Sequence, residues 1–220
     1  MSILSPILLS VRVAVLATAF TLVVGLGLAR LFTTRTVPLR RIWEALILLP
    51  MVFPPTIIGY LLLVMLGKRS PLGAFLAQMG LSVIFTWTAA VIASFVVSLP
   101  LMYQNCKAAL RGVDSQLENA ARTLGLREGR VFLRVTLPLA GPGILSGTAL
   151  SFARALGEFG ATLMVAGNIP GRTQTIPLAL YSAVESGRQA EANILLGVTV
   201  ALSFGVVVIV SVYERVQARR

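Results

Sequence analysis

Long runs of uncharged, mostly apolar residues dominate this sequence and restrict how it can fold. Of its 220 residues, 56% are hydrophobic and only 12% are charged, whereas a soluble domain usually carries about 25% charged residues. So little polar surface cannot cover a globule that faces water. A helix that crosses the bilayer, whose hydrocarbon core is about 30 Å thick, needs roughly 20 apolar residues. The sequence therefore predicts an all-α membrane protein.

Five stretches are long enough to cross a bilayer as helices, and together they predict one membrane domain that covers residues 1–220. The expected spans are residues 13–29, 45–66, 81–103, 139–166 and 192–213. A weaker run, residues 173–184, is too short to span and contains Pro177, so a sixth short or re-entrant segment is expected there. Four prolines are candidates for kinks that a gate could use, although membrane helices also tolerate proline without any gating role: Pro50, Pro54, Pro55 and Pro100.

The positions of Lys and Arg predict the orientation, because loops that stay in the cytoplasm are enriched in these residues. Thirteen cations lie after the first span, between the third and fourth spans, and in the tail, against four in the remaining loops. The thirteen are Arg30, Arg35, Arg40, Arg41, Lys107, Arg111, Arg122, Arg127, Arg130, Arg134, Arg215, Arg219 and Arg220. We therefore expect the N-terminus outside, the C-terminus in the cytoplasm, and charges that serve topology and lipid contact rather than nucleic-acid binding.

Small residues recur every four positions in the last two spans. The two stripes are Gly143, Gly147, Ser151 and Ala155 in the fourth span, and Gly197, Ala201 and Gly205 in the fifth. Because small residues allow two backbones to approach closely in a membrane, the spacing predicts close helix contacts along both stripes.

The loop of residues 104–140 has its own helical pattern, too short and too charged to enter the bilayer. One face of a helix is formed by Val113, Leu117, Ala120, Ala121 and Leu124. Ser115 and Glu118 have the spacing of a capping box, and Gly125 suits the end of the helix. A second short helix is predicted over residues 128–135, stopping before Leu137. This helix, turn and helix would present a surface to a partner.

The same loop resembles a known motif. Residues 118–125, Glu-Asn-Ala-Ala-Arg-Thr-Leu-Gly, followed by Val-Thr-Leu-Pro at 135–138, resemble the "EAA" loop of ABC importer permeases, apart from Asn119 and Val135. In that family, of the type I importer fold, the loop forms coupling helices that dock on a separate ATPase subunit. The resemblance assigns docking to Glu118, Ala120, Ala121, Arg122, Gly125, Leu137 and Pro138. The alternative is that Glu118 only caps its own helix and the alanines reflect helix propensity.

The sequence holds no ATPase of its own. The pair Gly67-Lys68 is followed by Arg69 and lacks the glycine that a phosphate-binding loop needs. With no histidine and one cysteine, the chain also lacks the usual ligands of zinc or haem, so no metal site and no catalytic residues are expected. The resemblance implies a non-enzymatic permease without a cofactor. Its implied partners are an ATPase subunit that carries ATP and magnesium, an extracytoplasmic oxyanion-binding protein, and a second copy of the chain.

The segment of residues 154–181 narrows the resemblance. It begins Arg-Ala-Leu-Gly-Glu-Phe-Gly and continues through Asn-Ile-Pro-Gly and Thr-Gln-Thr, and it is similar to permeases of molybdate importers. Sulfate and thiosulfate permeases share the first part. The resemblance therefore implies an oxyanion cargo, with molybdate as the first choice and tungstate, sulfate or thiosulfate as alternatives.

Two ionisable residues, Arg154 and Glu158, lie four apart in the fourth predicted span. An ionisable residue at membrane depth is a candidate functional residue, and this spacing allows the two to pair. Arg154 could face the path of an anion, or the two could form a structural ion pair. If instead they titrate during turnover, the chain would be an ion-coupled secondary carrier. A membrane scaffold that only recruits a partner through the loop would need neither role.

Overall fold

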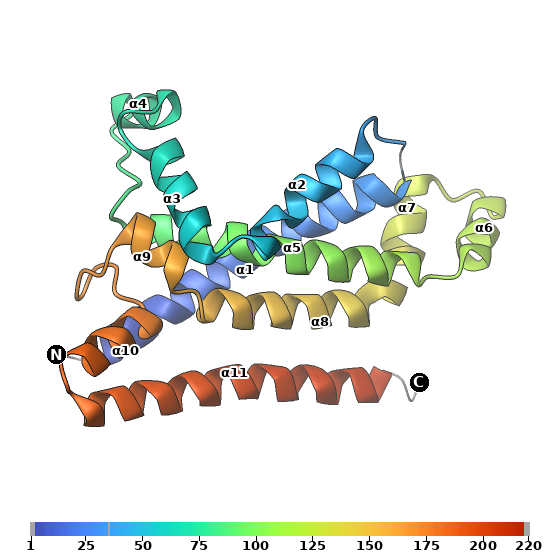
Figure 1. Ribbon diagram of the computed structural model, residues 1–220. Helices are drawn as coiled ribbons and strands as arrows, with labels where there is room; N and C mark the ends of the chain where they lie inside the picture. Colours follow the sequence, from blue (N-terminus) through green and yellow to red (C-terminus); the bar gives the residue numbers. More distant parts are fainter. Residues whose placement is uncertain (1–2, 35, 218–220) are drawn as a thin grey trace.

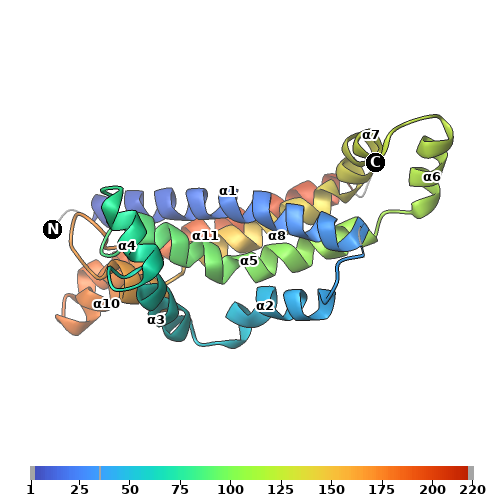
Figure 2. The same cartoon turned by 90° about the horizontal axis from the view of Figure 1, so that it is seen from above.

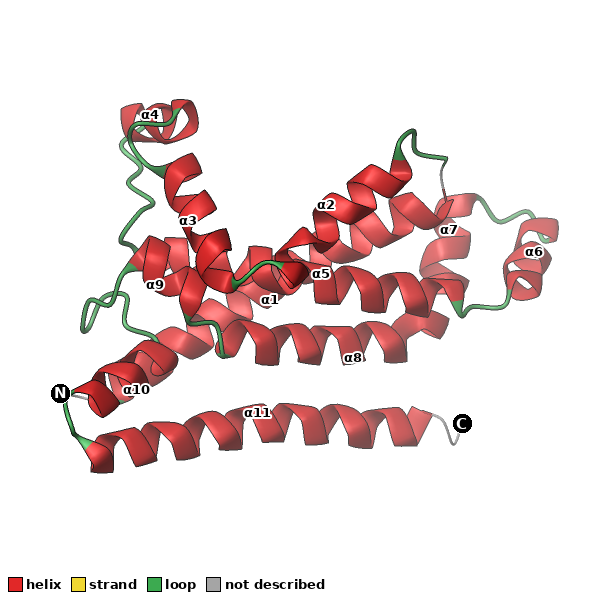
Figure 3. Ribbon diagram, viewed as in Figure 1, coloured by secondary structure: helices red, strands yellow, loops and turns green. Residues whose placement is uncertain are grey.

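The computed structural model describes residues 3–34 and 36–217, and this part of the chain contains only helices and loops (Figure 3). Three of the cations used to predict the orientation, Arg35, Arg219 and Arg220, lie outside the described residues. The α-helices are α1 (Leu4–Thr34), α2 (Arg40–Val52), α3 (Pro55–Leu66), α4 (Pro71–Gln78), α5 (Trp87–Arg111), α6 (Ser115–Thr123), α7 (Glu128–Val131), α8 (Leu137–Leu156), α9 (Gly160–Ala166), α10 (Ile176–Glu185) and α11 (Gln189–Gln217), and a π-helical segment, η1 (Phe132–Thr136), joins α7 to α8.

Four long apolar helices run alongside one another and form the body of the molecule (Figure 1). α1, α5, α11 and the continuous helix from Glu128 to Leu156 are each long and apolar enough to cross a membrane. α2 and α3 pass the same test only as a pair, bent by 115° at the break between them. The described residues thus contain four candidate spans, or five if the bent pair counts as one, in agreement with the prediction of about five.

Helix α5 is the centre of the fold. It packs along both α1 and α8 (Figure 2). Small residues of α5 such as Ala89, Ala93 and Ser94 are buried. Helix α11, in contrast, lies at the edge, against α8 and α10. Large apolar side chains of α11 such as Ile194, Val200 and Phe204 are exposed, and in a membrane such a helix needs few buried contacts to be stable.

Several predicted span boundaries were wrong, and proline or glycine explains two of the differences. The second predicted span is broken at Phe53 and Pro54, because each of these residues precedes a proline, which favours an extended backbone over a helical one. The third begins at Trp87 rather than at residue 81. The fourth ends at Leu156 and resumes as α9 at Gly160, after an interruption that contains Gly157. Pro100, in contrast, lies inside α5 without ending it.

The sixth predicted segment corresponds to α10, a short apolar helix that begins at Ile176 with Pro177 in its first turn. A loop enters it from α9, and the Ser10 hydroxyl of α1 accepts a hydrogen bond of 2.7 Å from the Ile176 N–H. α10 then packs against α11. The loop and α10 are thereby held against the ends of two long helices.

The two stripes of small residues have different outcomes. In α8, a methyl group built on Gly143 would lie 2.7 Å from the Ala109 Cβ, and one on Gly147 would lie 2.6 Å from the Asn105 Cβ, so this stripe does allow close contact with α5. In α11, Gly197 and Gly205 have nothing within 4 Å among the described residues. The predicted contact is confirmed for α8 and is absent for α11 within the described part of this chain.

Substituting Gly147 by leucine is expected to destabilise the fold by about 1–3 kcal/mol, because the larger side chain forces α5 and α8 apart. The matched control is Gly197→Leu, which places the same side chain on an open helix face. Thermal unfolding of both variants in detergent tests this expectation. Equal losses of stability in the two variants would contradict it.

Candidate functional site

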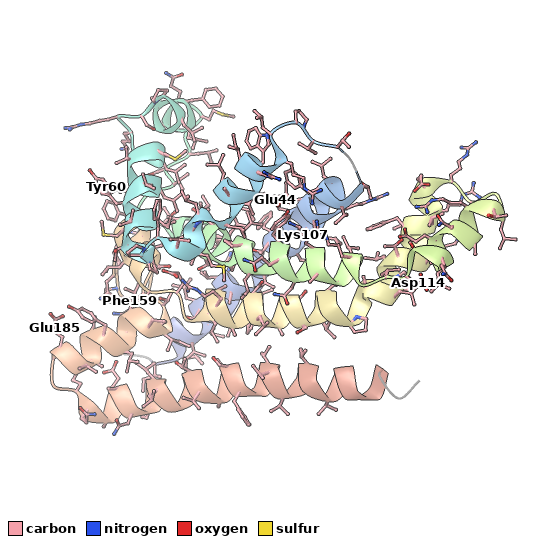
Figure 4. The ribbon with its side chains drawn as sticks, turned by 45° about the vertical axis from the view of Figure 1, so that its right-hand side comes forward. Glu44, Tyr60, Lys107, Asp114, Phe159 and Glu185 are labelled. Carbon is pink, nitrogen blue, oxygen red and sulfur yellow. The ribbon has the colours of Figure 1, made fainter. Side chains whose placement is uncertain are left out.

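Helix α6 stands apart from the bundle at the end of α5 and forms most of the loop predicted to couple to a partner (Figure 1). Its N-cap is Asp114, labelled in Figure 4, whose carboxylate accepts a hydrogen bond of 2.8 Å from the Gln116 N–H. The predicted capping box of Ser115 and Glu118 was therefore wrong, because Ser115 is already helical. Gly125 ends the helix as predicted, with a positive φ of 81° that favours glycine.

Glu118 and Arg122 fasten α6 to the elements that follow it. The Thr136 hydroxyl donates a 2.5 Å hydrogen bond to Glu118, which ties α6 to the π-helical segment η1. The Arg122 guanidinium donates to Glu128 at 2.7 Å and to the Asn119 side chain at 2.7 Å. The hydrogen bond to Glu128 raises the pKa of the Arg122 guanidinium above its ordinary value. These contacts connect the outer helix to the start of a long membrane helix, as a lever would require.

Helix α6 carries one exposed apolar stripe on an otherwise polar surface. Leu117 is 49% exposed and Leu124 is 83% exposed, and Ala120 lies exposed between them. Ala121, in contrast, is buried against its own chain, so this residue does not belong to the exposed face. Large exposed side chains around a small residue are typical of a protein–protein contact surface. Below we call Leu117, Ala120 and Leu124 the α6 face.

The end of the loop leads into the membrane helix without a break. The second short helix was predicted to stop before Leu137, but α7, η1 and α8 run continuously past Pro138. The wider turn of η1 directly precedes Pro138, which lacks the N–H that a regular helix would use there. Leu137 is partly buried in the core below, and Pro138 is exposed. A displacement of this segment would therefore act directly on α8.

Arg154 and Glu158 do pair. The Arg154 guanidinium donates a hydrogen bond of 2.7 Å to one Glu158 oxygen, and the other oxygen accepts one of 2.8 Å from the Ala161 N–H. The prediction that Glu158 lies on the same continuous helix as Arg154 was wrong, because Glu158 lies in the break between α8 and α9. Its carboxylate there accepts the hydrogen bond from the first turn of α9. The Glu158 side chain is 1% exposed and that of Arg154 is 35% exposed. Glu158 is thus a buried structural group, while Arg154 retains an open side.

The open side of Arg154 faces a cavity at the bend between α2 and α3. The cavity has a volume of about 310 Å³, and its other lining residues are Pro50, Met51, Phe53, Pro55, Val97 and Leu101. Arg154 is the one charged residue among the described residues that line this cavity, and its guanidinium is partly compensated by Glu158. Arg154 thus adjoins the break in the membrane helices, where a path could open.

A further polar cluster joins α2 to α5 and was not predicted from the sequence. One oxygen of Glu44 accepts hydrogen bonds from Arg40 at 2.9 Å, from Lys107 at 2.8 Å and from the Tyr103 hydroxyl at 3.0 Å. Figure 4 shows Glu44 and Lys107 on the two facing helices. Arg40 and Glu44 are four residues apart on α2, and Tyr103 and Lys107 are four residues apart on α5. These two spacings were the available signal, but nothing in the sequence connects one pair to the other.

Comparison with known proteins identifies the family. Residues 21–220 match the model of the family described as "Binding-protein-dependent transport system inner membrane component". The chain belongs to this family. The predicted multi-pass permease of the inner membrane is thereby confirmed, and membership implies a binding protein and an ATPase among the partners of this permease.

Curated relatives of the permease cover almost its whole length. It is 45% identical over 199 residues to the molybdenum transport system permease protein ModB of Escherichia coli (strain K12), and the aligned region covers 90% of this chain and 87% of the relative. It is 42% identical over 201 residues to the putative molybdenum transport system permease protein YvgM of Bacillus subtilis (strain 168), which covers 91% and 88%. These relatives are named as permease proteins, in agreement with a non-enzymatic subunit.

Solved structures support the fold of the permease. A chain of the MetNI methionine ABC transporter, in an inward-facing conformation, superposes with a TM-score of 0.76 at 18% identity, covering 98% of this chain and 99% of that one. A bacterial ABC transporter for the polysaccharide alginate also gives 0.76, at 14% identity, with coverage of 96% and 78%. The predicted all-α fold of ABC importer permeases is therefore confirmed.

Proposed function

We propose that this chain is the membrane-spanning subunit of an ABC importer that moves molybdate across the cytoplasmic membrane, driven by ATP hydrolysis on a separate subunit. The observation that carries this proposal is the similarity to molybdenum permeases over about nine tenths of the chain. Tungstate is the second candidate cargo, because it is a tetrahedral dianion of nearly the same size as molybdate, whereas sulfate is smaller. Sulfate and thiosulfate rank behind these two oxyanions.

The proposed docking surface for the ATPase subunit is the α6 face together with Gly125. Its exposed leucines supply apolar contact area, and Ala120 and Gly125 permit close approach of the partner. Glu118 and Arg122 transmit the motion, because they hold α6 to η1 and α7. Leu137 and Pro138 belong to the helix that receives it. ATP and magnesium bind to the ATPase subunit, and this chain binds no cofactor.

The proposed path passes the cavity at the α2–α3 bend. Arg154 attracts the oxyanion there. Glu158 neutralises part of the charge of Arg154, so that the cargo is not retained. A path that released its cargo slowly would limit transport. Affinity and selectivity then reside in the extracytoplasmic binding protein.

The complete path is proposed to form between two copies of the chain related by a twofold axis. No residue of α2 is fully buried within one copy. On α3, Ile57, Leu61 and Val64 are also exposed. The second copy or lipid would cover these apolar faces, which flank the bend that Arg154 of α8 adjoins. In the proposed orientation the N-terminus is outside and α6 lies in the cytoplasm.

Uptake by reconstituted vesicles tests this function. The permease is combined with its ATPase subunit and binding protein, and accumulation of radiolabelled molybdate is measured with and without ATP. We expect uptake that requires ATP and persists when ion gradients are collapsed. Uptake that follows an ion gradient without ATP would indicate a secondary carrier, and ATPase docking without uptake would indicate a scaffold. Competition by unlabelled tungstate and sulfate ranks the cargo.

A further inference from the structure

The Glu44 cluster has the composition of an anion-binding site. Arg40, Tyr103 and Lys107 all direct a donor to one carboxylate oxygen, at distances between 2.8 and 3.0 Å. Two cations surround one carboxylate, so the cluster keeps one net positive charge. Charge-assisted hydrogen bonds of this kind suit an oxygen of any anion, whether it belongs to a carboxylate or to a tetrahedral oxyanion. Glu44 therefore occupies a set of donors that another anion could use.

The cluster is adjacent to the proposed path. Val97 and Leu101 of α5 line the cavity that Arg154 faces, and Gln104, one turn further along α5, contacts the Met51 sulfur of the same cavity at 3.3 Å. Lys107 follows one turn later. At 1.5 Å per residue, Lys107 lies about 9 Å beyond Leu101 along the helix axis. An anion that leaves the Arg154 cavity between α2 and α5 would next meet this cluster.

The two sides of the cluster differ in how firmly they are held. Tyr103 is 1% exposed and belongs to α5, the central helix of the bundle. Arg40 and Glu44 lie on α2, which has no fully buried residue and is joined to α3 by the 115° bend. α2 is therefore packed less tightly than α5, and a displacement of α2 would withdraw Glu44 while Tyr103 and Lys107 stay on the central helix.

We propose that Arg40, Tyr103 and Lys107 form a transient binding site for the transported oxyanion, and that Glu44 fills this site in the empty permease as a built-in anion that the cargo displaces. This inference rests on the proposed function. A tethered carboxylate competes at an effective concentration in the mM range, so the cargo binds weakly and leaves readily. Glu44 also satisfies the two cations when no cargo is present, which avoids leaving them unpaired between the helices.

Binding of radiolabelled molybdate to the purified permease–ATPase complex tests the proposal, with no binding protein and no ATP present. Glu44→Ala removes the competing anion, and we expect its apparent Kd to be at least about tenfold lower than that of the wild type, a difference of about 1.4 kcal/mol. Adding Lys107→Gln to Glu44→Ala should return the Kd to the wild-type value. Molybdate uptake by the Glu44→Ala complex should be slower than wild type, because release becomes slow.

Glu44→Gln provides a second test, since it removes the charge but keeps the volume of the side chain between the helices. The matched control is Glu185→Gln on α10, a carboxylate that also accepts a hydrogen bond from a tyrosine, Tyr181, but lies far from the path (Figure 4). It should bind molybdate like the wild type. The proposal is overturned if both Glu44 variants bind like the wild type, or if tighter binding persists after Lys107→Gln.

The outcome for the proposed function is read separately. Wild-type complex that takes up no molybdate in the vesicle assay refutes that function, whatever the Glu44 variants do. The binding assay is repeated with radiolabelled sulfate, so that the effect of Glu44 on anion binding is also measured if the cargo is a different tetrahedral oxyanion. Wild-type uptake together with unchanged binding in both Glu44 variants refutes the site alone.

Discussion

Replacing Gly125 by tryptophan is expected to abolish transport and ATP-hydrolysis coupling while the permease remains folded. A methyl group built on Gly125 has nothing within 4 Å among the described residues, so the new side chain starts in open space. The backbone at position 125 has a positive φ of 81°, which adds strain of about 1–2 kcal/mol when the residue is not glycine. The larger effect is the bulk added beside Leu124, where the ATPase subunit is proposed to dock. Molybdate uptake and stimulated ATPase activity in vesicles measure it.

Gly187→Trp is the matched control for this prediction. Gly187 also has a positive φ, of 70°, and open space around it, but it lies between α10 and α11, at the opposite end of the molecule from α6 (Figure 1). It should suffer the same strain and keep transport. Gly125→Asn tolerates the left-handed conformation and separates strain from bulk. The coupling role of Gly125 fails if Gly125→Trp transports as well as Gly187→Trp.

Replacing Arg154 by methionine is expected to destabilise the permease by about 3–5 kcal/mol, because it leaves the Glu158 charge buried without its partner. The Glu158 side chain is 1% exposed, so water cannot replace the guanidinium. The control is Arg188→Met, which breaks an ion pair with Glu191 in which the arginine is 41% exposed. That change should cost less than about 1 kcal/mol. Thermal unfolding in detergent compares the two variants.

The double variant Arg154→Met, Glu158→Gln separates the structural role from the proposed role in transport. The neutral amide no longer needs a counter-ion, and its oxygen can still accept the hydrogen bond from the Ala161 N–H, so stability should recover. If Arg154 attracts the oxyanion, the stable double variant should still lose most of its molybdate uptake. Wild-type uptake by the double variant would show that the pair serves only to hold α8 and α9 together.

Local patterns were sufficient where the local sequence decides the structure. The apolar runs predicted the membrane helices, because each needs only its own length and hydrophobicity to be stable in lipid. Gly125 ends α6 as predicted, since the left-handed conformation there is a property of one residue. The Arg154–Glu158 pair was predicted from its spacing and is present at 2.7 Å.

Contacts between distant segments could not be predicted in the same way. Thr136 accounts for the orientation of Glu118, and no local pattern connects these two residues. The Glu44 cluster joins α2 to residues about 60 positions later in the chain. The stripe on α11 led to a wrong prediction of a helix contact. Small residues permit a close contact, but they do not determine whether a second helix lies beside them.

By itself, the sequence determined that this protein is a bundle of membrane helices with a polar loop suited to a partner, because hydrophobic length and helical periodicity are properties of short segments. Only the tertiary structure decided where a cavity and a polar cluster lie between the helices. The cavity beside Arg154 and the three donors around Glu44 depend on how α2, α5 and α8 are placed relative to one another. That placement results from packing between segments far apart in the chain, which no local pattern encodes.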